Sequence, residues 1–130
     1  MRVQLTKNFY LDEFQCKDLS DIPLEVFDNI LELADNMQVI RDILKRPITV
    51  NSGYRSPEYN DNVIGGAKGS KHKLGQACDF TVKGLMPNEV AKAVKMLITE
   101  MLISQGGVGM YDTFTHYDIR GTKARWDNRK

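Results

Sequence analysis

The sequence has little of several features that usually suggest a function. Its 130 residues carry a formal net charge of only +1, which indicates neither a nucleic-acid ligand nor a strongly acidic partner. No apolar run approaches the ~18 residues that a membrane-spanning helix requires, and residues 1–10 lack the apolar core of a secretory signal peptide. We therefore expect a protein without a membrane span that is cytoplasmic as synthesised. We also expect a monomer.

Cysteine and histidine are also scarce, with two residues of each. One pair of cysteines without a secretion signal is weak evidence for a disulfide, so Cys16 and Cys78 are expected to be thiols. Cys78 should point into the core as a small apolar side chain. The two histidines are more informative, because each lies in a motif that also contains aspartate.

Helical and strand-like patterns together predict an α+β fold. Apolar residues recur at helical spacing after Pro23 as far as Leu44, and again after Pro87 as far as Leu102. Segments rich in β-branched and aromatic residues predict strands at 48–50, 77–82, 108–111 and 114–120. We expect one domain, residues 1–130, with a small, mainly antiparallel sheet and helices packed on one side.

The most informative residues for function are Ser70-Lys71-His72-Lys73-Leu74-Gly75-Gln76-Ala77-Cys78-Asp79, followed later by His116-Tyr117-Asp118. Neutral imidazole and carboxylate are good ligands for Zn2+. Three protein ligands leave a fourth position for water, which is the arrangement of a catalytic zinc site. His72, Asp79 and His116 are therefore predicted to bind zinc in a groove at the sheet surface.

The spacing of these residues predicts how the chain brings them together. The interval of seven residues from His72 to Asp79 fits neither a helical ligand pair nor a straight strand, and Gly75 within it can take the positive φ of a reversing loop. On the predicted strand 114–120, alternation places His116 and Asp118 on one face.

The pattern Ser-x-His-x-x-Gly-x-Ala-x-Asp followed by His-x-Asp resembles the zinc D-Ala-D-Ala carboxypeptidase family, which acts on bacterial cell-wall peptides. Further matching segments are Asn8-Phe9, Glu13-Phe14, Asn51-Ser52-Gly53-Tyr54-Arg55-Ser56-Pro57, Gly106-Gly107-Val108-Gly109-Met110-Tyr111 and Ala124-Arg125-Trp126. The resemblance thus covers nearly the whole chain. It is greatest to the short, single-domain members of bacteriophages and prophages.

The resemblance implies a zinc metallopeptidase acting on peptidoglycan stem peptides, either as a carboxypeptidase or as an endolysin-type endopeptidase. Arg55 matches the position at which the family places an arginine near the substrate, and a guanidinium suits either a carbonyl or a carboxylate. An ion pair that braces its loop is the alternative for Arg55. Tyr54 and Ser70 are further candidates for substrate binding, although Tyr54 equally suits a core ring and Ser70 a contact to a ligand imidazole.

The general base is where the sequence departs from the best-known members of the family. These carry an acidic residue three positions before the last zinc histidine, where this chain has Thr113. Asp118 and Asp112 become the candidates for the general base. Asp118 is favoured because alternation places it on the same face as His116, whereas Asp112 is only close to it in sequence. Asp118 is equally suited to orienting a ligand, and a different assignment makes Asp118 the third ligand and His116 a donor to the transition state.

Two other segments give weaker predictions. Residues 65–70 form a flexible, glycine-rich approach to His72 that lacks the residue order of a phosphate-binding loop. The basic tail, residues 122–130, is expected to be a solvated end, with Trp126 folding its start back onto the body.

A second function remains open because of Thr113. The chain could be a catalytically weak, zinc-containing module that binds the cell wall, as the hedgehog signalling domains of similar architecture suggest, or a structural component of a phage particle. If the substrate is peptidoglycan, the protein must reach the wall by lysis, with the help of another protein, or as part of a particle.

Overall fold

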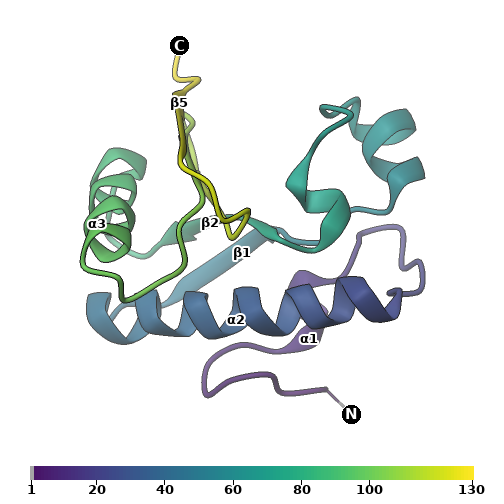
Figure 1. The fold of residues 1–130 in the computed structure, drawn as a ribbon, viewed down its shortest axis with the longest axis horizontal. Coiled ribbons are helices and arrows are strands. Elements are labelled where there is room, and N and C mark those ends of the chain that lie inside the picture. The colour runs from purple at the N-terminus through teal and green to yellow at the C-terminus, as the bar shows by residue number, and fades with distance from the viewer. Residues whose placement is uncertain (1) are drawn as a thin grey trace.

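A computed structural model describes residues 2–130 (Figure 1). Three α-helices, five strands and two short helices of other types occur among these residues. In chain order they are α1 (Leu11–Phe14), α2 (Leu24–Leu44), β1 (Ile48–Ser52), the π-helix η1 (Tyr59–Ile64), the 3-10 helix η2 (Lys71–Leu74), β2 (Ala77–Val82), α3 (Pro87–Thr99), β3 (Gly107–Met110), β4 (Thr115–Asp118) and β5 (Ala124–Asp127).

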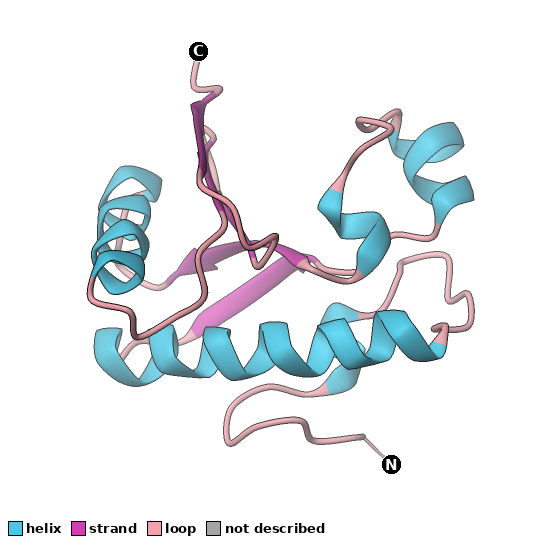
Figure 2. Cartoon of the chain, viewed as in Figure 1, coloured by secondary structure: helices cyan, strands magenta, loops and turns pink. Residues whose placement is uncertain are grey.

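The strands form one mainly antiparallel sheet in the order β1-β2-β4-β3-β5. Three neighbouring pairs are antiparallel, and β5 alone pairs in parallel, with β3. Figure 2 shows a strong twist, with β1 and β2 running across the view and the other strands nearly upright. The predicted α+β fold is therefore confirmed.

The two long helices cover one face of the sheet, with α2 lying below β1 and β2 and α3 beside the upright strands (Figure 1). Alternation along β2 and β4 sends Cys78, Phe80 and Tyr117 into the core on this face, where all three are fully buried. Asp79 and His116 consequently face the opposite side, which the helices leave open.

Local sequence signals explain where the helices begin and end. Pro23 precedes the first turn of α2, and Lys45 takes the left-handed conformation, with φ 54°, just after its last turn. Pro87 opens α3, and the side chain of Glu89 accepts a hydrogen bond of 2.8 Å from the backbone N–H of Met86.

Two expectations about the C-terminal half are wrong. The helix α3 ends at Thr99 rather than continuing through Leu102, which is 53% exposed. The tail is not simply a solvated end, because β5 adds a strand to the sheet edge. The expectation that Trp126 folds the start of the tail back onto the body is confirmed. Propensity favours helix continuation, but Met101, with φ 61°, turns the chain toward β3.

The two cysteines agree with expectation. Cys16 and Cys78 are free, buried thiols. Within residues 2–130, no helix is both long enough and apolar enough to cross a bilayer.

Candidate metal centre

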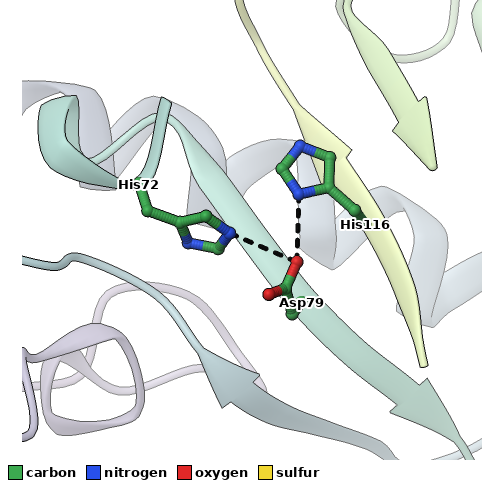
Figure 3. Close-up of side chains that lie close together, drawn as sticks. All are labelled: His72, Asp79 and His116. Carbon is green, nitrogen blue, oxygen red and sulfur yellow. Dashed lines mark hydrogen bonds and ion pairs between the residues drawn. The ribbon is translucent and has the colours of Figure 1, made fainter. Parts of the chain in front are cut away.

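Three elements bring His72, Asp79 and His116 together on the open face of the sheet (Figure 3). His72 lies in η2, while Asp79 and His116 are directly opposed residues of β2 and β4. Gly75, with φ 73°, ends η2 and turns the chain into β2, as the spacing predicted.

The three side chains converge on one point. Oδ1 of Asp79 lies 3.2 Å from Nε2 of His72 and 3.0 Å from Nδ1 of His116. One potential ligand atom from each residue lies within 4.8 Å of the others, and all three residues are buried. Two imidazoles and a carboxylate form a donor set that suits Zn2+.

Each of these side chains is oriented by a second partner on its far side. Nδ1 of His72 donates a hydrogen bond of 2.7 Å to the carbonyl oxygen of Gly53, which leaves Nε2 as the atom available to a metal. Nη2 of Arg55 donates to Oδ2 of Asp79 at 3.2 Å, so Oδ1 remains directed at the histidines. Such outer hydrogen bonds fix ligand orientation in protein metal sites, so the surroundings also fit a bound cation.

The outer partner of His116 is Asp118, whose Oδ2 lies 2.7 Å from Nε2 of the imidazole. The Asp118 carboxylate is fully buried and also accepts hydrogen bonds from the backbone N–H groups of Gly107 and Arg120. The Arg120 guanidinium donates two more, at 2.8 and 2.7 Å. Asp118 is therefore saturated with donors and lies on the opposite side of the His116 ring from Asp79.

These contacts shift the pKa values of the site. Burial acts to raise the pKa of Asp79, but hydrogen bonds from His116 and His72 outweigh it and hold the pKa well below its usual value. Burial likewise opposes ionisation of Asp118, yet its hydrogen bonds from Arg120 and His116 lower the pKa strongly. For His116, burial acts to lower the pKa, and the two carboxylates overcome it and raise the pKa above 6.5.

A groove of about 520 Å³ opens over the three residues. One wall is aromatic and contains Tyr111, Phe114 and Trp126. The rings of Tyr111 and Phe114 stack at a centroid distance of 4.4 Å, and Nε1 of Trp126 donates to the Tyr111 hydroxyl at 3.0 Å. The facing wall comes from the glycine-rich segment, through Gly66, Ala67, Gly69, Ser70 and Lys71, so the loop predicted from sequence does border the site.

Two of the three predicted substrate-binding residues line this groove. Arg55 and Ser70 line it, whereas Tyr54 is 4% exposed and borders a separate hollow beside α1. The Ser70 hydroxyl accepts a hydrogen bond from the backbone N–H of His72 and so caps η2, rather than contacting the imidazole. Asp112 and Thr113 are exposed and do not line the groove.

Sequence reasoning missed the role of three residues. Arg120 pairs with Asp118 two positions earlier, a spacing that strand alternation would have revealed. The buried side chain of Asn60 donates to the carbonyl of Ala67 and accepts from Nη1 of Arg55, tying the glycine-rich loop to the arginine. Gly53 acts through its carbonyl, for which a sequence has no signal.

Comparisons with known proteins are consistent with this geometry. The family model described as peptidase M15 matches residues 7–118. The chain is 28% identical over 125 residues to the peptidoglycan L,D-endopeptidase MepK of Escherichia coli (strain K12), and equally so to the protein of the same name in Shigella flexneri. Each alignment covers 92% of this chain and 62% of the relative, so the chain spans less than two thirds of those proteins.

Proposed function

The chain belongs to the peptidase M15 family, and from this we propose that it is a zinc-dependent peptidase that hydrolyses a peptide bond in the stem peptides of bacterial peptidoglycan. The observation that carries the proposal is the buried convergence of His72, Asp79 and His116 in a groove open to solvent. The name of the E. coli and Shigella relatives supports peptidoglycan as the substrate class.

His72, Asp79 and His116 would hold the metal. When bound, Zn2+ would polarise a peptide carbonyl and lower the pKa of a bound water toward ~7. Gly53, Arg55 and Asp118 hold the three ligands in place from outside.

Arg55 has a second role in this proposal, as a donor to the substrate. Its contacts to Ser52, Asn60 and Asp79 use one N–H on each guanidinium nitrogen, and its side chain remains 16% exposed in the groove. Nη1 and Nη2 each carry a second N–H. The arginine is thus held rigidly while it can still donate to a substrate carbonyl or carboxylate.

We assign Asp118 to positioning rather than to proton transfer. A general base must reach the proton that it removes, directly or through one water. Asp118 is enclosed behind His116, and Asp112 lies outside the groove. Asp118 accepts five hydrogen bonds and is therefore a fixed acceptor. It keeps Nε2 of His116 protonated and Nδ1 directed at the metal position.

One observation favours a second candidate function. Across residues 2–130, the only carboxylate that lines the groove is that of Asp79, a proposed metal ligand. A site without a second acidic group would hydrolyse peptides slowly, so a zinc-containing module that binds the wall with little turnover remains the alternative.

Zinc content and product analysis test the proposal together. The purified protein and His72→Ala are loaded with zinc, assayed for bound metal and incubated with purified peptidoglycan, and the released fragments are identified by mass. We expect one zinc per wild-type chain, metal-dependent release of new amino groups, and loss of both in His72→Ala. The fragment masses distinguish removal of a terminal D-Ala from internal cleavage.

Two other results would change the assignment. Stoichiometric zinc with retention on peptidoglycan but no fragments would establish the binding module. Absence of bound zinc would contradict the metal site itself.

A further inference from the structure

The groove has an excess of positive charge that the nearly neutral chain as a whole does not show. Three cationic side chains line it, those of Arg55, Lys71 and Arg120, against the single carboxylate of Asp79. A bound zinc ion would add to this excess. A concave site lined by charge of one sign attracts ligands of the opposite sign.

Two of the three cations already have a carboxylate partner. Arg55 pairs with Asp79 at 3.2 Å, and Arg120 pairs with Asp118 at 2.7 Å. Lys71 differs from both, because its ammonium group makes no ion pair with any carboxylate of residues 2–130.

The two neighbouring lysines differ from Lys71, Lys73 by its ion pair and Lys68 by its position. Lys73 is held against Asp61 at 3.3 Å and also donates to the carbonyl of Lys68. Lys68 is exposed and does not line the groove. Of the three lysines in this segment, only Lys71 lines the groove.

The position of Lys71 is fixed by the same structure that places the metal ligand. It is the first residue of η2 and immediately precedes His72. Its carbonyl accepts hydrogen bonds from the backbone N–H groups of Gly75 and Gln76, so its backbone cannot move independently of the site. The opposite wall, formed by Tyr111, Phe114 and Trp126, offers aromatic rings and no carboxylate partner.

We propose that Lys71 is a specificity-determining residue that binds a carboxylate of the substrate beside the bond that is cleaved. This inference rests on the proposed function. Stem peptides can carry free carboxylates at the second residue, the third residue and the C-terminus, and each can be replaced by a carboxamide in a synthetic peptide. An ammonium group gains a charge-assisted hydrogen bond to a carboxylate that it does not gain to a carboxamide.

The test compares synthetic stem peptides that differ only in one such group. Four substrates are needed: one with every carboxylate free, and three with a carboxamide at the second residue, at the third residue or at the C-terminus. kcat/KM is measured for the zinc-loaded wild type, Lys71→Met, Lys71→Arg and the matched control Lys68→Met, with zinc content measured for each variant.

We expect the wild type to prefer the free carboxylate at one of these positions by roughly tenfold in kcat/KM. Lys71→Met should reduce that preference to less than about twofold, chiefly because it slows cleavage of the peptide with the free carboxylate. Lys71→Arg should restore the preference, and Lys68→Met should retain it. The position at which the preference occurs identifies the carboxylate.

A wild type that cleaves all four peptides equally, or a Lys71→Met variant that keeps the full preference with normal zinc content, would overturn the assignment of Lys71 alone. A zinc-loaded wild type that cleaves none of the peptides would instead overturn the proposed function, and this inference with it.

Discussion

Replacing Asp118 by alanine should destabilise both the fold and the metal site. The side chain is fully buried and accepts five hydrogen bonds, one of them from Nε2 of His116. Alanine removes both carboxylate oxygens, so the Arg120 guanidinium and the Gly107 N–H lose the acceptor of their hydrogen bonds.

The structure sets the expected size of the effect. Removal of one partner of a buried ion pair typically costs about 3–5 kcal/mol, because the remaining charge stays desolvated. The Arg120 side chain is 25% exposed and can be rehydrated, so we expect about 3 kcal/mol in the free energy of unfolding of the metal-free protein. Loss of the hydrogen bond to His116 should weaken zinc binding about 10- to 100-fold.

The chain contains a matched control for this measurement. Asp127 and Arg129 repeat the contact of Asp118 and Arg120, with the same residue spacing and a bidentate pair at 2.9 and 2.7 Å, but both side chains are 43% exposed. Urea unfolding after chelation and competition with a chromophoric zinc chelator should therefore show large changes for Asp118→Ala and little change for Asp127→Ala.

One result would refute this reasoning. An Asp118→Ala protein with wild-type unfolding and wild-type zinc affinity, but with turnover reduced by about 10²–10⁴-fold, would identify Asp118 as the general base.

Three further perturbations have defined outcomes. The raised pKa of His116 stabilises the metal-free fold below pH 6.5, and this contribution is lost as pH rises through the folded pKa. Urea midpoints should therefore fall as pH rises above 6.5, while zinc affinity rises over the same range. Gly109→Ala would place a methyl group against the indole of Trp126, so near-ultraviolet circular dichroism should show the ring displaced. Gly53→Ala would collide with the backbone of α1 and move the carbonyl that orients His72, so zinc affinity should fall in calorimetric titrations while the helix content stays unchanged.

Much of the candidate site could be predicted because its signals are local. The interval from His72 to Asp79 and the glycine within it predicted a reversing loop that enters a strand. Alternation correctly placed His116 and Asp118 on one face.

The unpredicted parts depend on contacts between distant segments. Nothing near Gly53 in sequence indicates that its carbonyl meets a side chain 19 positions later. The strand β5 has only four residues, two of them charged, and its pairing with β3 becomes favourable only once the sheet exists. Whether Asp118 faces the metal position or the far side of His116 likewise depends on packing, so the sequence could not distinguish a general base from an orienting group.

The position of Trp126 makes the protein its own optical probe. It is the only tryptophan in the chain, and its ring centroid lies 4.9 Å from that of the His116 imidazole. Indole emission is quenched by a protonated imidazole in contact and changes when that imidazole loses its proton or takes a ligand. Fluorescence from this single residue should thus follow the state of His116 in real time, without a label and without a substrate.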